Sequence, residues 1–256
     1  MRLGRRAVAF AIFALAAAAP ASAETEHITR TFKLGPNGLL WINSFSGRVN
    51  ITGTDDTDTS VDAIRHGTRT QLDRIKLDIS ADSTTIRIDA NEHQRSWWNF
   101  WEPYGAVDTD LDIKVPRRTN LTITLFSAAL DVQGVEGSHN IETFSSRVRL
   151  VDVAGPVRGR SFSGPFDIQA ASWREHAMID VETFSGRVDV RLPSTAQGTV
   201  DFDSFSGQLS TTEPLIVETK RRNRFTGRLG RDDRDGDGST GTVRVKTFSG
   251  NLTIDR

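Results

Sequence analysis

The sequence has no cysteine among its 256 residues. This absence excludes disulfide cross-links, a thiolate metal site, a cysteine nucleophile and the modified cysteine of a lipoprotein anchor. The folded chain must therefore be held together by burial of apolar side chains and by hydrogen bonds.

Long apolar runs are also scarce. The one that occurs, Ala7 to Ala19, is too short to span a bilayer as a helix. Three arginines precede it, and the small residues "PASA" follow it and end at Ala23. This order is typical of a secretory signal peptide. We expect residues 1–23 to be a signal peptide cleaved near Ala23, and the mature chain to be exported to the periplasm, the cell surface or the medium, without a transmembrane segment.

Neither sign of charge dominates the chain. The formal net charge is −1, and it becomes −4 once the three leader arginines are removed, with 29 basic and 33 acidic residues remaining. This balance argues against nucleic acid as a partner. The mature length is sufficient for one domain, and length alone does not exclude two.

What the sequence has in abundance is a short motif around phenylalanine, first seen as "SFSGRV" at Ser44–Val49. From the second copy onward, and counting a looser copy at Phe225, successive copies are 18 to 23 residues apart. A period near 20 is typical of a solenoid, in which each coil buries its apolar face against its neighbours. The motif phenylalanines are Phe45, Phe126, Phe144, Phe162, Phe184, Phe205 and Phe248.

Alternating apolar and polar residues flank the motif, as in Ile179 and Val181 before it and Val188 and Val190 after it. This period of two indicates short strands with one buried face, and helical patterns are few. The predicted fold is all-β: a single-stranded parallel β-helix with coils of about 18–23 residues.

The strand must reverse its faces within the motif, because Thr183 shares the phase of Ile179 whereas Phe184 shares the phase of Val188. A reversal at Ser-Gly would turn the serine inward and the ring outward, giving an exposed ladder that marks a binding surface or a covered face. A reversal one residue earlier would stack the rings inside. The predicted turn residues, which suit a bulge or a positive φ, are Gly47, Gly164, Gly186, Gly207 and Gly250.

The coil pattern V-x-V-x-T-x-S-G-x-V-x-V, preceded by Val115-Pro116 in "LDIKVPRRTNLTI", resembles exported bacterial domains of unknown function called putative adhesins. The resemblance covers roughly residues 30–256, and this chain departs from it by using phenylalanine in almost every copy. It implies a β-solenoid akin to the heads of autotransporter adhesins and a surface or envelope role, but no particular ligand.

We divide the mature chain into irregular N-terminal β coils, residues 24–110, and a regular β-helix, residues 111–256. The first part contains an aromatic loop at 91–105, which we interpret either as a plug over the core or the ladder, or as a binding patch for a glycan, membrane or protein. Its aromatic residues are Trp97, Trp98, Phe100, Trp101 and Tyr104.

The second part contains a polar loop at 221–241. Asp233, Asp235 and Asp237 in this loop match the start of a calcium loop, but Arg244 replaces the glutamate expected at its twelfth position. A charged loop without metal and a weak calcium site are the two interpretations. No cofactor is predicted.

Two rows of charged residues are expected on the outer faces of the coils. One alternates in sign at first and predicts ion pairs between neighbouring strands: Asp131, Arg149, Asp167 and Asp189. The other follows the motif and is either a solvated face or a weak site for an anion: Arg48, Arg147 and Arg187.

Catalysis is not predicted. The five histidines show no close metal-ligand spacing, and "NSFSG" and "RSFSG" lack the glycine two residues before a hydrolase nucleophile. We expect a non-catalytic binding or structural module whose partner is an envelope component, a glycan or a protein. The alternatives are self-association through an uncapped C-terminal coil, and a polysaccharide-active enzyme.

Overall fold

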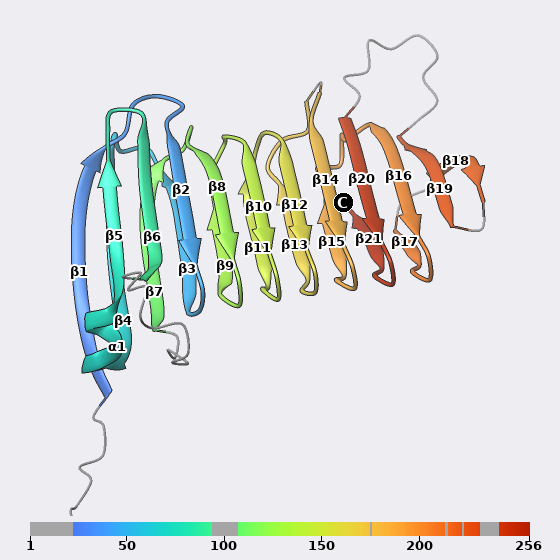
Figure 1. The fold of residues 1–256 in the computed structure, drawn as a ribbon. Coiled ribbons are helices and arrows are strands. Elements are labelled where there is room, and N and C mark those ends of the chain that lie inside the picture. Colours follow the sequence, from blue (N-terminus) through green and yellow to red (C-terminus); the bar gives the residue numbers. More distant parts are fainter. Residues whose placement is uncertain (1–22, 94–106, 175, 213–214, 222, 231–240) are drawn as a thin grey trace, which may run out of the picture.

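The structure is a computed structural model, and it describes residues 23–93, 107–174, 176–212, 215–221, 223–230 and 241–256. These residues form two large β-sheets, with one short helix, α1 (Arg69–Arg74), beside them (Figure 1). The prediction of an all-β chain with parallel strands is confirmed.

The ten-stranded sheet contains, in spatial order, β1 (Ala23–Lys33), β4 (Asp58–Thr68), β7 (Asp108–Pro116), β3 (Arg48–Thr54), β9 (Ala129–Gln133), β11 (Val148–Val153), β13 (Phe166–Ala170), β15 (Val188–Arg191), β21 (Leu252–Asp255) and β17 (Leu209–Thr211). The eleven-stranded sheet contains β18 (Leu215–Lys220), β19 (Arg224–Leu229), β16 (Gly198–Ser204), β20 (Gly241–Thr247), β14 (Met178–Thr183), β12 (Val157–Ser161), β10 (His139–Thr143), β8 (Asn120–Leu125), β2 (Leu39–Ser44), β6 (Thr85–His93) and β5 (Ile75–Ala81).

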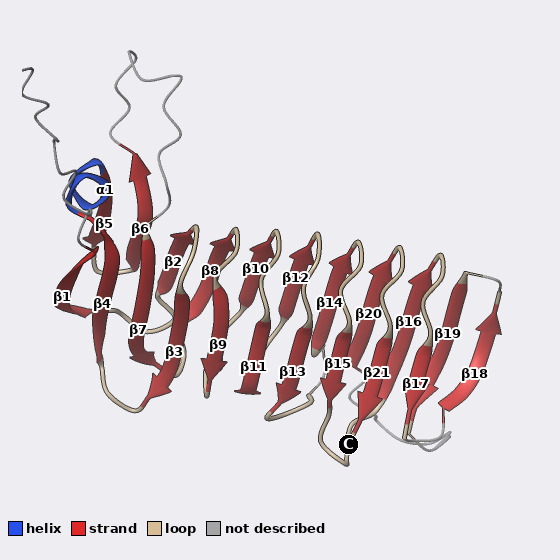
Figure 2. Cartoon of the chain, turned by 90° about the horizontal axis from the view of Figure 1, so that it is seen from below, coloured by secondary structure: helices blue, strands red, loops and turns tan. Residues whose placement is uncertain are grey.

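In the middle of the molecule the chain alternates between the two sheets. A strand of the eleven-stranded sheet leads through a motif turn to a strand of the ten-stranded sheet, and we call each such pair a coil (Figure 2). Equivalent strands of neighbouring coils are parallel and in register, as when Val181 lies beside Gly159. Like positions therefore form rows at the spacing of paired strands, ~4.8 Å.

The core lies between the two sheets. Alternate residues of each strand point into it, such as Ile179 and Val181 of β14 and Val188 and Val190 of β15, all of which are buried. One continuous cluster of buried apolar side chains extends from Leu34 to Ile254. The period of two in the sequence therefore identifies the inward face correctly.

The spatial order of the coils departs from the sequence. We expected the coil with Phe205 to follow the coil with Phe184, but β20 pairs with β14 on one side and β16 on the other. Likewise β21 lies between β15 and β17. The coil made last in the sequence is thus inserted between two earlier coils, and Figure 1 places the C-terminus within the stack.

This insertion overturns the idea of an uncapped C-terminal coil. Both strands of that coil have partners on both sides, so their backbone groups are not free to pair with another molecule. The stack ends instead with β17 in one sheet and with β19 and β18 in the other, where β19 is antiparallel to β16 and β18 is antiparallel to β19.

The N-terminal part also stacks out of sequence order. The coil β2–β3 packs directly against β8–β9, so the long gap between Phe45 and Phe126 places no coil between them. Strands β6 and β7 lie on the other side of β2–β3, and the segment between them holds the aromatic residues at 97–104. Antiparallel β4 and β1 extend one sheet, and antiparallel β5 extends the other.

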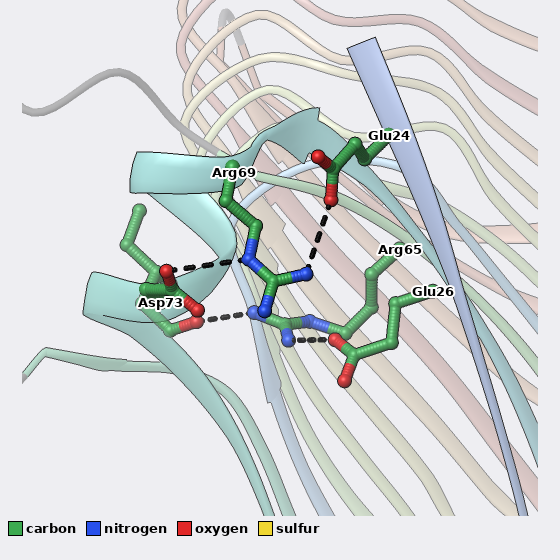
Figure 3. Close-up of polar contacts among 6 residues, drawn as sticks. Glu24, Glu26, Arg65, Arg69 and Asp73 are labelled. Carbon is green, nitrogen blue, oxygen red and sulfur yellow. Dashed lines mark hydrogen bonds and ion pairs between the residues drawn. The ribbon is translucent and has the colours of Figure 1, made fainter.

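Ion pairs fasten β1 to the rest of this end (Figure 3). Arg65 of β4 is buried, and its guanidinium donates to Glu26 at 2.5 Å and to the carbonyl of Ile75. Arg69, in α1, contacts Glu24 at 3.3 Å and Asp73 at 3.5 Å. These contacts join four elements, β1, β4, β5 and α1, at the outer end of the stack.

Candidate binding surface along the phenylalanine ladder

In three coils the residue before the motif phenylalanine stabilises the turn. The hydroxyl of Thr183 accepts a hydrogen bond from the backbone N–H of Gly186 at 2.9 Å, and Thr247 and Gly250 repeat the arrangement at 2.7 Å. Serine does the same in the coil with Phe205, where Ser204 accepts from Gly207 at 2.6 Å. Such local bonds from Ser and Thr favour turns, which explains the first position of the motif.

The strand reverses its faces between phenylalanine and serine, one position earlier than a reversal at Ser-Gly. The rings nevertheless point outward, so the expectation that an earlier reversal would stack them inside is wrong. In the coil with Phe184, both this ring and Ser185 are exposed, and the next residue, Gly186, is buried. The expectation that the motif serine turns inward is therefore wrong. The inward corner belongs to the following residue, which is small in each case because the neighbouring coil passes close by.

Two physical reasons select glycine at this corner. At Gly47 and Gly164 the φ angles are +104° and +146°, which L side chains rarely adopt. At Gly186, Gly207 and Gly250 the reason is space: a Cβ on Gly250 would lie 2.0 Å from the carbonyl oxygen of Gly186. The predicted turn glycines are thus at the turns, but only two of the five have a positive φ.

The seven rings form one continuous stack. Neighbouring ring centroids lie 4.6 to 5.1 Å apart, and the planes deviate from parallel by 1° to 7°. Backbone hydrogen bonds between coils fix this spacing, such as Phe144 N–H to the carbonyl of Leu125 at 3.0 Å. We call this stack the phenylalanine ladder; its spatial order is Phe45, Phe126, Phe144, Phe162, Phe184, Phe248, Phe205.

The ladder faces outward. Its side chains are 40% to 65% exposed, and apart from Ile216 and Val217 they are the exposed large apolar residues of the described part of the chain. Phe205 at one end is the most exposed, at 65%. An apolar strip of this length is unusual on a monomer and indicates an interaction site or a covered face.

A row of alternating charges runs beside the ladder, two residues before the rings of Phe144, Phe162, Phe184 and Phe248. Glu142 and Arg160 are register partners, as are Arg160 and Glu182, and Glu182 and Lys246. Their side chains pair along the row, with Arg160 3.5 Å from Glu142 and 3.8 Å from Glu182, and Lys246 3.3 Å from Glu182. We call Glu142, Arg160, Glu182 and Lys246 the charged row. Sequence reasoning missed it, although its constant offset from the motif was visible.

Shallow grooves separate the charged row from the ladder. One, of about 880 Å³, lies along Phe162, Phe184 and Phe248, and all four members of the charged row line it. A second, of about 500 Å³, lies along Phe45, Phe126 and Phe144. The ladder and the charged row therefore lie side by side and form one surface on the outer face of the eleven-stranded sheet.

The charged residues that we expected on the outer faces are placed as follows. Arg149 contacts Asp131 at 3.3 Å, which confirms the predicted ion pair between neighbouring strands, whereas Asp167 pairs with Arg191 at 3.0 Å. Asp189 pairs with Arg187 of its own strand region at 2.7 Å. These are exposed pairs, typically worth 0–1 kcal/mol, so they mark a solvated face.

Arg48, from the row after the motif, is held by an acidic partner. It contacts Asp110 at 2.7 Å, and this hydrogen bond lowers the pKa of the Asp110 carboxyl. Arg187 is likewise occupied by Asp189. A continuous anion-binding stripe of Arg48, Arg147 and Arg187 is therefore not favoured.

Two predicted sites cannot be placed. The aromatic residues Trp97, Trp98, Phe100, Trp101 and Tyr104 lie outside the described residues, and so do Asp233, Asp235 and Asp237. Among the residues that the structure describes, no group of three or more His, Asp or Glu is arranged to hold a metal ion. No helix in the same part of the chain is long and apolar enough to cross a membrane.

One buried titratable group lies near this surface. His139 begins β10 with its side chain in the core, and neither ring nitrogen has a hydrogen-bond partner. Burial lowers the pKa of His139 to about 4, and the nearby carbonyl of Pro156 opposes this only in part. The ring is therefore neutral at physiological pH and acts as a core residue.

Comparison with known proteins supports the fold. No protein-family model and no curated protein matches the sequence. A solved structure of a "putative cell adhesion protein" from Clostridium sporogenes is similar with a TM-score of 0.54 at 12% identity, over 90% of this chain and 99% of that one. A "putative adhesin" from Bacteroides fragilis has a TM-score of 0.35 at 10% identity, over 89% and 97% of the two chains. At 12% identity the first likeness concerns the fold alone, and the TM-score of the second is too low to show a shared fold.

Proposed function

We propose that this chain is an exported, non-catalytic β-solenoid of the bacterial cell envelope and that the phenylalanine ladder is its binding surface. The observation that carries the proposal is the outward stack of seven rings. Burial of such a strip against a partner stabilises the complex by roughly 25 cal/mol per Å² of apolar area. The name of the solved structure with a TM-score of 0.54, a "putative cell adhesion protein", agrees with a role in binding.

The geometry of the ladder favours an apolar protein or lipid surface over a glycan. Because the rings stack in parallel, each interior ring has both faces covered by its neighbours and exposes only its edge. Flat ligands such as sugars and nucleobases bind to ring faces, and the interior rings of the ladder offer none. A continuous row of ring edges instead offers an apolar ridge, suited to another ridge or to acyl chains.

A cosedimentation experiment tests the proposal. The purified mature protein is mixed with an envelope fraction from a source strain lacking the gene, and the bound fraction is measured. We expect the triple variant Phe144→Ser, Phe162→Ser, Phe184→Ser to lose at least tenfold in binding. Val217→Ser is the matched control, because it removes an exposed apolar side chain away from the ladder.

Two outcomes would count against this proposal. Undiminished binding of the triple variant, with unchanged circular dichroism, would exclude the ladder as the binding surface. Release of sugar from a panel of envelope polysaccharides would exclude a non-catalytic role.

A further inference from the structure

The ladder and the charged row together have a self-complementary pattern. Along the row the charges alternate, with Glu142, Arg160, Glu182 and Lys246 on successive coils. All four charged residues share one groove with Phe162, Phe184 and Phe248. A partner that covers the rings must therefore also meet these charges.

A second copy of the chain can meet both features through a twofold axis. If the axis is perpendicular to the ladder and lies in the contact plane, the two ladders run antiparallel. Each row then faces its own counterpart, rings against rings and charges against charges. Such isologous contacts are the commonest arrangement in homodimers.

The alternation of charge selects the position of this axis. An axis through the coil of Phe162 would place Arg160 against Arg160 and Glu142 against Glu182. An axis between the coils of Phe162 and Phe184 places Arg160 against Glu182 of the second copy and Glu142 against Lys246 of the second copy, each twice. Moving the axis by one coil in either direction would leave either fewer rings in contact or fewer pairs of opposite charge between the two copies.

The other side of the ladder tolerates the same arrangement. Three residues after the ring, Arg147 would face Asn251 of the second copy, and Arg187 would face Pro165 of the second copy. No pair of like charges is created on that side. The pattern is therefore compatible with a second copy on both flanks of the ladder.

We propose that the phenylalanine ladder joins two copies of this chain in an antiparallel dimer whose twofold axis passes between the coils of Phe162 and Phe184. This inference rests on the proposed use of the ladder as a binding surface and names its partner. Like-charge contacts exclude the registers with the axis on the coil of Phe162 or of Phe184, so the charged row sets the register and the rings supply most of the buried apolar area.

Sedimentation velocity over a range of protein concentrations is the first test. We expect the mature protein to change from monomer to dimer as its concentration rises. The variant Phe162→Ser, Phe184→Ser should remain monomeric at concentrations at which the wild type and the Val217→Ser control are dimeric. A wild type that is monomeric at every concentration, or a double variant that still dimerises, would overturn the proposal.

A mixing experiment tests the register without altering the rings. Arg160→Glu alone sets the introduced carboxylate against Glu182 of the second copy, and Glu182→Arg alone sets the introduced guanidinium against Arg160 of the second copy. Each variant should dimerise at least tenfold more weakly than the wild type. An equimolar mixture should recover dimers, because the heterodimer opposes unlike charges at both positions.

Mixing cannot repair contacts within one chain, so recovery reports only on contacts between chains. Arg149→Glu is the control, since Arg149 lies on the ten-stranded sheet and should not affect dimerisation. A mixture no more dimeric than its components would overturn the proposed register.

The two proposals fail in different ways. A monomeric protein whose ladder variants still lose envelope binding would overturn the dimer and leave the proposed function intact. If dimer formation depended on the ladder and envelope binding did not, the dimer would stand and the proposed function would be overturned.

Discussion

Phe184 stacks on Phe248 with the ring centroids 5.0 Å apart and the planes within 1° of parallel. The coil that carries Phe205 lies between these residues in the sequence but beyond Phe248 in the structure. The similarity of the coils makes this exchange of order feasible, because the same motif turn joins the two strands of each coil. The ladder is therefore continuous even though the chain does not follow it in sequence.

Substitution of a corner glycine should destabilise the stack. A Cβ at Gly250 would lie 2.0 Å from the carbonyl oxygen of Gly186. We expect Gly250→Ala to lower the free energy of unfolding by roughly 1–3 kcal/mol, the usual cost of overpacking. Urea denaturation of the variant and the wild type measures this difference in the free energy of unfolding. Ala128→Gly, at the equivalent buried corner, is the control and should cost no more than about 1 kcal/mol. Equal stability of Gly250→Ala and the wild type would show that the coils can separate at no cost.

The threonine before the ring should matter through its hydroxyl. Thr183→Val keeps the shape but removes the acceptor for the N–H of Gly186. Because that N–H is buried, the loss should be about 1–3 kcal/mol in the free energy of unfolding. Thr183→Ser retains the acceptor and should lose less than half as much. If the two variants were equally stable by thermal denaturation, the hydroxyl would have no part in the turn.

Stability should fall on mild acidification because of His139. Its folded pKa of about 4 lies below the ordinary 6.5, so the unfolded chain binds a proton first as the pH falls. Neutral His139 makes its full contribution to the free energy of unfolding above about pH 6.5. This free energy should therefore be about 2 kcal/mol lower at pH 5 than at pH 7. In His139→Leu this loss between pH 7 and pH 5 should largely disappear. An unchanged loss in that variant would assign the pH dependence to other groups.

The stability of the attachment of β1 to the rest of the structure should depend on Glu26. Removing its charge by Glu26→Gln leaves the buried guanidinium of Arg65 without its carboxylate. We expect amide hydrogen exchange in β1 to accelerate at least tenfold, while exchange in β9 and β11 stays as in the wild type. Glu218→Gln, which removes an exposed ion pair with Arg228 at the other end of the stack, is the comparison. Uniform acceleration across all strands would point to global destabilisation instead.

Sequence reasoning identifies most strands of the regular coils well because their inward and outward residues alternate. Ile179, Val181, Val188 and Val190 alternate in the sequence and are buried in the structure. It also locates the turns, since the motif places a hydroxyl, a ring and a small residue at constant positions. These features are local, so one coil is enough to reveal them.

The order of the coils could not be predicted in the same way. The edges of β14, β16 and β20 offer similar backbone pairing and similar inward residues, so the local pattern does not specify which coil neighbours which. The direction of the rings stayed undecided for a related reason. The reversal can occur on either side of the phenylalanine, and only the packing of the small corner residue against the next coil decides it.

The insertion of β20–β21 has a consequence for how the protein acquires its structure. Growth of a stack by addition of each newly synthesised coil to the previous one can proceed only as far as β15. Strands β16 and β17 must then wait, unattached to that growing end, until the segment synthesised after them supplies the surface on which they dock. Completion of the native state is thus a late, long-range event, which favours slow folding and leaves the edge of β16 exposed until β20 is made.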